Sequence, residues 1–287
     1  MRTDLVPRTR DGYACHMGRA HDAQRKLHRM LRRAAFVAVL AALAVSCRST
    51  APPAGIDPAM ASCVPPDALL LAGFDVPAIR SSPLRGKLPL VEAFLEPFHG
   101  AAHLLLAFDG KDLLTIARGP ASAAPASGTP VERGLAVSGR DAAVRAAIAR
   151  HRRGPVATAG LVAFAGSVAA GKPIWIVARG GVTLPLTGNA ANLNRLLRDS
   201  EFAAVTAALG PQVRVEATAI GRTPEAARDV EETLRAILAM MSMAEKRGSD
   251  AAALLGAIEI RRQDRTVNAS VSATADALGK LLEPLGR

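Results

Sequence analysis

Short apolar runs bounded by glycine, proline or aspartate recur along most of the chain, and this pattern predicts β-strands. Where two such runs flank a short polar turn, as at Asp109-Gly110-Lys111, an antiparallel hairpin is expected. The expected strands are 68–74, 103–108, 112–118, 135–139, 174–180 and 213–220, with a last hairpin on either side of Gln263 and Asp264.

Stretches in which apolar residues recur every three or four positions predict helices between these strands. The longest begins with Thr223 as its cap and Pro224 in its first turn. Its apolar side is formed by Val230, Leu234, Ile237, Leu238 and Met241. A second helical stretch is expected over 187–210, with Leu193, Leu196, Leu197, Phe202 and Val205 on its buried side. Further helices are expected twice within 76–99, over 140–153 and up to Leu282, whereas 160–171 fits a helix or a strand.

These elements indicate an α+β fold, with a mostly antiparallel or mixed sheet and helices packed on it. Residues 119–134 have low complexity and are expected to form a surface loop. The segments 110–119 and 171–180 share five of ten residues, which an internal duplication or chance in an Ala/Gly/Arg-rich chain would explain. Both explanations stay open, so the globular region 67–287 is one unit or two related halves, 67–153 and 154–287.

The N-terminal part has the order of a bacterial export signal. Arg32 and Arg33 precede an uncharged apolar run over 34–45, and small residues lead into Cys47. The sequence Ala44-Val45-Ser46-Cys47 resembles the lipobox of bacterial lipoproteins, although Ala44 stands where that family usually has leucine. The resemblance implies cleavage before Cys47 and a diacylglycerol on its sulfur. A simple signal peptide or a short membrane anchor is the alternative, and the anchor fits less well because the run is short of the roughly 20 residues of a spanning helix.

A lipobox divides the chain into a signal peptide at 1–46, with Met30 as an alternative start, and a lipidated tether at 47–66. The tether is rich in Pro, Ala and Ser and is expected to be flexible. Such a protein would be extracytoplasmic and held on the periplasmic face of a membrane through Cys47. Arg48 is not the Asp that resembles the inner-membrane retention signal, which favours the outer membrane.

Cleavage also changes how charge and cysteines are interpreted. Nine of the 36 Lys and Arg residues and three of the 25 acidic residues lie in 1–46, so the net charge falls from +11 to +5. The basic composition is therefore poor evidence for nucleic-acid binding, and one Trp with six Phe leaves few stacking surfaces after residue 46. Cys63 is then unpaired in the tether; a Cys47–Cys63 disulfide is the alternative if Cys47 is not acylated.

Motifs that could carry chemistry are incomplete. Residues 166–173 (GSVAAGKP) come close to a phosphate-binding loop, but proline stands where Ser or Thr is needed, so a turn at Gly171 and Lys172 is expected. His99 and His103 have a spacing that zinc could use on a helix, but Gly100 lies between them, and a capping or surface role is expected.

Other polar or soft residues have local explanations. His151 falls at the end of a helix, where cations interact favourably with carbonyl groups, and Asp109 and Asp112 are turn acids. Met240, Met241 and Met243 are expected to fill the core. The sequence therefore assigns no catalytic residue, metal or cofactor, and Cys47 is its one site residue.

The function favoured by the sequence is that of a non-enzymatic cell-envelope lipoprotein, anchored in the membrane through Cys47, that binds a protein partner or has a structural role. A lipoprotein that binds a small or apolar ligand between sheet and helices is the alternative. A hydrolase with an unrecognised site comes third.

The first prediction concerns the anchor. We expect a fatty-acid analogue fed to the producing cells to label the protein, and the label to disappear in the Cys47→Ala variant, because the lipid is attached to this sulfur. Label that persists in Cys47→Ala would contradict the lipobox interpretation.

Overall fold

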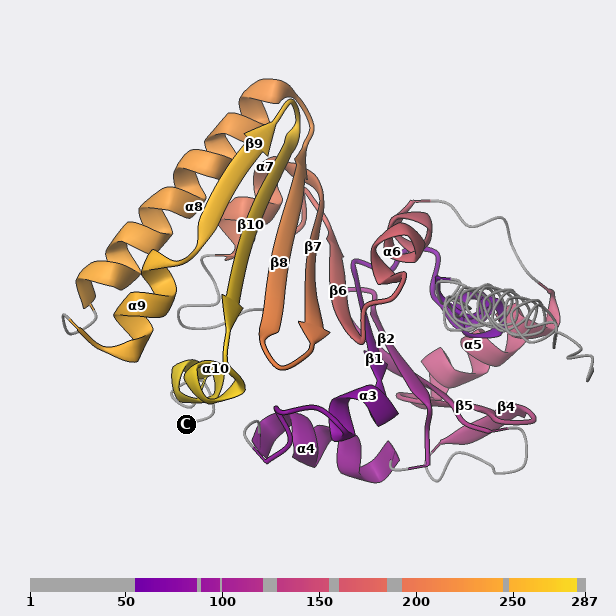
Figure 1. Cartoon of the computed structure of the whole chain (residues 1–287). Helices are drawn as coiled ribbons and strands as arrows, with labels where there is room; N and C mark the ends of the chain where they lie inside the picture. Colours follow the sequence, from indigo (N-terminus) through magenta and orange to yellow (C-terminus); the bar gives the residue numbers. More distant parts are fainter. Residues whose placement is uncertain are drawn as a thin grey trace, which may run out of the picture. The chain divides into compact units, whose positions relative to one another are not determined.

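In the computed structural model, ten strands from the described residues form one antiparallel sheet (Figure 1). The structure describes residues 55–86, 89–98, 100–120, 128–154, 160–184, 193–244 and 248–282. All of them belong to the compact unit Pro53–Arg287. Cys47, Cys15 and His99 lie outside the described residues.

The strands are β1 (Leu70–Asp75), β2 (His103–Phe108), β3 (Leu113–Arg118), β4 (Thr129–Glu132), β5 (Leu135–Ser138), β6 (Ile174–Arg179), β7 (Ser200–Leu209), β8 (Val213–Gly221), β9 (Glu259–Gln263) and β10 (Thr266–Ala273). The helices are α2 (Pro58–Cys63), α3 (Val76–Arg80), α4 (Pro89–Leu95), α5 (Asp141–Arg152), α6 (Leu161–Ala169), α7 (Leu193–Asp199), α8 (Pro224–Ala244), α9 (Asp250–Gly256) and α10 (Ala275–Leu282), with a 3-10 turn, η1 (Glu96–Phe98), after α4. The expected α+β class with an antiparallel sheet is confirmed.

The strand order is β4-β5-β3-β2-β1-β6-β7-β8-β10-β9. Counted outward from the central pair β1 and β6, both halves follow one scheme: three strands in chain order, then the fifth, then the fourth at the edge. The similar segments 110–119 and 171–180 fall on β3 and β6, which do not correspond in this scheme. Duplication as the origin of the two halves stays a prediction.

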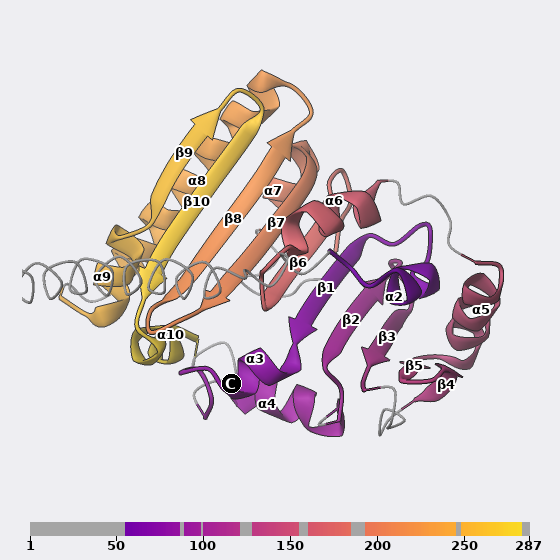
Figure 2. The same cartoon turned by 45° about the vertical axis from the view of Figure 1, so that its right-hand side comes forward.

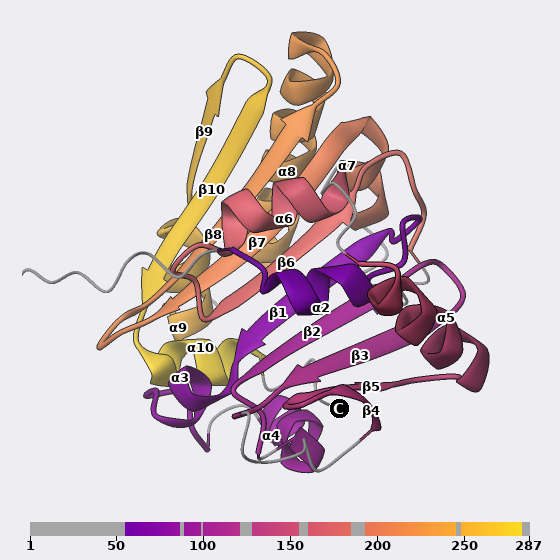
Figure 3. The same cartoon turned by 90° about the vertical axis from the view of Figure 1, so that its right-hand side faces the viewer.

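One face of the sheet carries α2, α5 and α6, which lie in front of β3, β2, β1, β6 and β7 in Figure 3. The side chains that point to this face are deeply buried. Those of Leu71, Leu105, Ile116 and Val177 each expose at most 1% of their surface. They pack against Met60 and Cys63 of α2, Val144 and Ala147 of α5, and Leu161 and Ala165 of α6. This is the largest core of the fold.

The opposite face is covered in separate patches. Helices α3 and α4 with η1 pack over the ends of β1, β2 and β3 around Val76, Leu95 and Phe98. Helices α7 and α8 lie behind β7, β8 and β10 in Figure 2, and α9 and α10 pack against each other near Leu254 and Leu278. Between these patches, sheet side chains on this face stay open to solvent, for example Ile176 and Val205.

The expected helix over 187–210 is wrong from Ser200 onward, because 200–209 is strand β7 between β6 and β8. Its alanines satisfy a helical and an alternating pattern equally, so neighbouring strands decide its conformation. The helix is confined to Leu193–Asp199 in the described residues. Likewise, the expected loop 119–134 contains the edge strand β4, and 160–171 resolves as helix α6.

The tether expected over 47–66 is too long at its C-terminal end. Asp57 caps α2 by accepting hydrogen bonds from the backbone N–H groups of Ala59 and Met60, at 2.7 and 3.3 Å. Met60, Cys63 and Val64 are buried in the main core. The fold therefore begins before Asp67, and Cys63 belongs to it rather than to a flexible segment.

The second prediction tests the pairing of β1 with β6. Gly73 lies opposite Trp175, and a Cβ on Gly73 would stand 2.1 Å from the indole ring. We expect Gly73→Ala to lower the free energy of unfolding by about 2–3 kcal/mol through overpacking. In the control Gly166→Ala, where a Cβ meets nothing within 4 Å, stability should be unchanged or raised by up to about 1 kcal/mol. Equal effects of both variants in urea unfolding would contradict this interpretation.

Candidate functional site

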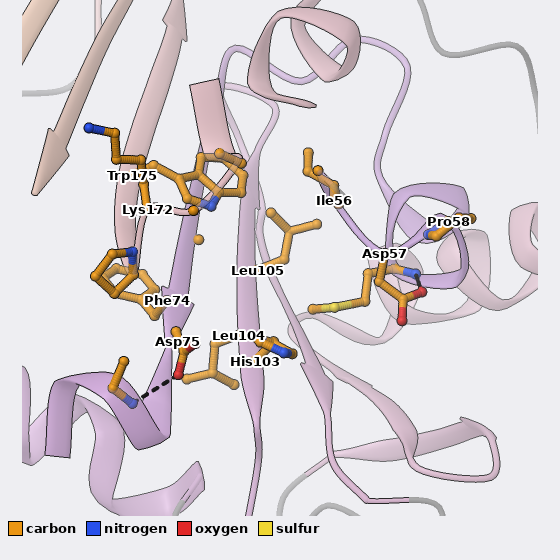
Figure 4. A pocket seen from close by; sticks show the side chains of 17 residues that line it. Ile56, Asp57, Pro58, Phe74, Asp75, His103, Leu104, Leu105, Lys172 and Trp175 are labelled. Carbon is orange, nitrogen blue, oxygen red and sulfur yellow. Dashed lines mark hydrogen bonds between the residues drawn. The ribbon is translucent and has the colours of Figure 1, made fainter. Parts of the chain in front are cut away.

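Among the described residues, hollows adjoin both faces of the sheet. The first is a cleft of about 560 Å³ between α2, β1 and the turn after α6 (Figure 4). Trp175, Phe74 and Leu105 form its apolar wall, and Asp57, Asp75, His103 and Lys172 are its polar residues. Its volume is larger than that of the groove on the opposite face, and its lining contains His103, one of the two histidines with a spacing that zinc could use.

The charged groups of this cleft have structural partners. Asp57 caps α2 and forms an ion pair with Arg118 at 3.3 Å, and Asp75 caps α3 by accepting a hydrogen bond from the N–H of Ala78. Lys172 donates to Glu216 at 2.8 Å, and this hydrogen bond lowers the pKa of Glu216. These contacts account for Asp57, Asp75 and Lys172 by the fold itself.

The zinc and phosphate-loop interpretations find no support among the described residues. No group of three or more His, Cys, Asp or Glu side chains there could hold a metal ion. His103 starts strand β2, and His99 lies outside the described residues. Gly171 and Lys172 form the expected turn, with Gly171 in the left-handed region at φ +69°, and a strand follows where a phosphate loop needs a helix.

A polar cluster that the sequence did not predict joins α2, β4 and α5. Ser62 Oγ lies 2.8 Å from His151 Nδ1, and His151 Nε2 lies 3.3 Å from Glu132 Oε2. The order serine, histidine, acid resembles that of a hydrolase triad. However, the Ser62 hydroxyl also donates to the carbonyl of Ala59 within its own helix, at 2.7 Å. The cluster therefore ties three elements together, beyond the helix-end role expected for His151.

The second hollow is an apolar groove of about 250 Å³ on the opposite face, between the sheet and helices α7 and α8. Its floor consists of two adjacent cross-strand rows. One row is Ile176, Val205, Ala217 and Ala269, and the other is Ala178, Ala203, Ala219 and Val267. Because most of these side chains are alanine, the floor leaves space that larger residues would fill.

Helices α7 and α8 line the other side of the groove. Leu196 and Leu197 come from α7, Val230 and Leu234 from α8, and Leu184 from the segment after β6. The Asn194 side chain fixes that segment by hydrogen bonds with both backbone groups of Leu184, at 2.9 and 3.0 Å. Ile176 and Val205 expose 37% and 42% of their surface, so the groove is open to solvent.

The groove was only partly predictable. Val230 and Leu234 of the longest helix and Leu196 and Leu197 of α7 were expected on buried sides, and they line it. Met240, Met241 and Met243 were expected in the core, and this is wrong, because they expose 54%, 45% and 79% of their surface. The alternation of residues 213–220 could have pointed to the alanine floor, since Ala217 and Ala219 both fall on its apolar side.

Comparison with known proteins finds solved structures with a partial likeness to this chain. No family model and no curated protein match the chain. Crystal form I of a protein named TP0453 is similar with a TM-score of 0.46 and 10% identity, covering 81% of this chain and 99% of that one. Its crystal form III is similar with a TM-score of 0.45 and 10% identity, covering 80% and 99%. Within the described residues, no helix combines the length and apolar character that a membrane crossing requires.

The third prediction concerns Cys63, which is fully buried between α2 and the sheet. Burial raises the pKa of its thiol to about 11. In the unfolded chain the thiol loses its proton near its ordinary pKa of about 8.5. Between these values the unfolded state binds fewer protons than the folded state, so stability falls as pH rises, by up to about 3 kcal/mol.

Urea unfolding at several alkaline pH values measures this slope. The Cys63→Val variant keeps an apolar side chain of similar size and lacks the titrating group, so its alkaline loss of stability should be smaller. The same pH dependence in both proteins would contradict the assignment.

Proposed function

We propose that this protein is a membrane-anchored lipoprotein of the cell envelope that binds an acyl chain in the groove between the sheet and helices α7 and α8. The observation that carries the proposal is the chemistry of the groove. All but one of its lining residues are aliphatic, and the exception, Thr218, lies on β8 between Ala217 and Ala219. Alternation along the strand directs its side chain to the other face, where its hydroxyl donates to Asn268 Oδ1.

An acyl chain suits such a groove because it needs no hydrogen-bond partner. A ligand with polar groups would lose its contacts with water there without replacing them. Each methylene that leaves water contributes about 0.8 kcal/mol, so a short length of chain already gives a measurable affinity. The volume is below the roughly 300–1,000 Å³ of sites for drug-sized ligands, which favours one narrow chain over a bulky apolar molecule.

A membrane held close by a lipid anchor at Cys47 would be the source of such acyl chains. If Cys47 carries a lipid, seven residues separate it from Gly55, the first described residue. Fully extended, this connection spans at most about 30 Å. The fold would then stay close to a membrane surface, where acyl chains are abundant. The function favoured from the sequence, binding of a protein partner, is the competing outcome of the experiment.

The fourth prediction tests the groove. We expect native mass spectrometry of the purified protein to show a bound lipid or fatty acid, and a fluorescent fatty acid to bind and be displaced by palmitate. Ala217→Phe should weaken this binding at least tenfold, because the ring fills the middle of the floor, between Val205 and Ala269.

Asn268→Phe is the matched control, since Asn268 is exposed on the opposite face of the neighbouring strand. It should bind the probe like the wild type. If no small molecule is bound and crosslinking in membranes returns a stable protein partner, the acyl-chain proposal is wrong and the protein-binding function is supported.

A further inference from the structure

Helix α8 changes character along its length. Its first half carries the charged residues and two ion pairs of i,i+4 spacing, Arg228 with Glu232 and Glu231 with Arg235. After Arg235 the helix has no charged side chain up to its end at Ala244. The uncharged part, 236–244, is about 14 Å long at 1.5 Å per residue.

The same helix leaves the sheet progressively. Gly221 lets its first turn come close to β8, because a Cβ there would stand 2.6 Å from the backbone nitrogen of Ala227. Ala227 and Val230 are buried, Leu234, Ile237 and Leu238 are half-buried, and Met243 exposes 79% of its surface. Burial therefore decreases along the helix while the sequence becomes more apolar, which is the reverse of what a helix covered only by its own fold would show.

Five consecutive residues, Ala239–Met243, are all exposed; we name them the methionine tip. At 100° per residue, five positions cover the whole circumference of a helix. A protein partner packed alongside would cover one side of the tip and leave the others in water. An apolar medium that surrounds the helix end covers all of them.

We propose that the methionine tip inserts into the interfacial region of the phospholipid membrane that holds the lipid anchor. The inference rests on the proposed membrane address, and it does not depend on the acyl-chain groove. The seven-residue connection between Cys47 and the described fold keeps Gly55, where that fold begins, within about 30 Å of that membrane, so the fold is tethered beside a lipid surface that the tip can reach by rotation of the whole fold. Interfacial helices bury apolar side chains about 5–10 Å deep, which is compatible with the length of the uncharged part.

The composition of the tip agrees with a lipid occupant. It contains none of the Trp, Tyr or Arg residues that dominate binding energy at protein interfaces. Methionine is unbranched and flexible, so it adapts to disordered acyl chains without a complementary surface. Ser242 is its one polar side chain, and a hydroxyl is tolerated near headgroups and inside helices.

The fifth prediction uses tryptophan fluorescence on the full lipidated chain, reconstituted into phosphatidylethanolamine and phosphatidylglycerol vesicles. Trp175 is the chain's one tryptophan and is buried, so the wild type supplies the background. In Met243→Trp we expect acyl chains substituted with bromine to quench most of the added fluorescence. Leu113→Trp is the matched control, since Leu113 is a large apolar residue with 49% exposure on β3, and its added fluorescence should persist.

Added fluorescence at Met243→Trp that persists on vesicles would overturn the proposal, and so would equal quenching at both positions. Ala217→Phe separates this proposal from the groove: quenching at the tip should survive that substitution while fatty-acid binding is lost. In the Met243→Trp protein, replacement of Met240 and Met241 by Gln should abolish the quenching of the added tryptophan and leave fatty-acid binding at the wild-type level.

Discussion

The packing of Trp175 across Gly73 is the contact on which the rest of the structure depends. These residues face each other on β1 and β6, the strand pair that joins the two five-stranded halves. Because Gly73 has no side chain, the indole ring occupies the space over β1 and becomes part of the main core with only 7% of its surface exposed. The next residue on β6, Ile176, points to the opposite face and begins the groove floor. One strand thus fixes the core on one side and the groove on the other.

The groove exists because α8 packs closely on the sheet at its start and lies farther from the sheet along the rest of its length. The first turn of α8 approaches β8 closely, which the small residues Gly221 and Ala227 permit. Val230 then packs against Val267 and fixes the helix on the sheet. Glu231 accepts hydrogen bonds from Arg235 and Arg262 at the outer side, although exposed ion pairs of this kind contribute little stability. Further along, alanines on the strands do not fill the distance to the departing helix. Packing therefore positions α8, and small side chains leave the hollow beneath it.

The sequence predicted the elements whose pattern is set locally. The hairpin at Asp109 formed as expected, with Asp109 Oδ1 accepting from the N–H groups of Lys111 and Asp112, and these hydrogen bonds lower the pKa of Asp109. Thr223 caps α8 through the N–H of Ala226. In contrast, Ser200–Leu209 was expected to be helical, since its alanines carry no clear periodicity and only its neighbours β6 and β8 make it a strand.

The candidate site was less predictable, because it depends on contacts between distant segments. Ser62 and His151 are 89 positions apart, and no spacing in the chain relates them. The exposure of Met243 depends on the distance between the last turn of α8 and the sheet. The hydrophobicity of the sequence alone does not predict that distance. Cys63 was expected in a flexible tether since the segment around it is rich in Pro and Ala, yet its burial is decided by α5 and the sheet.

The common strand order of the two halves has a consequence for stoichiometry. In the second half, 37 residues connect the third strand, β8, to the fourth, β9, and they contain α8 and α9. In the first half the corresponding connection, between β3 and β4, has ten residues, which is too short for a helix of 21 residues. Within the described residues, the first half therefore has no counterpart of α8 over its sheet, and the apolar groove belongs to the second half. Under the proposed function, each copy of the chain would bind one acyl chain in the groove of its second half.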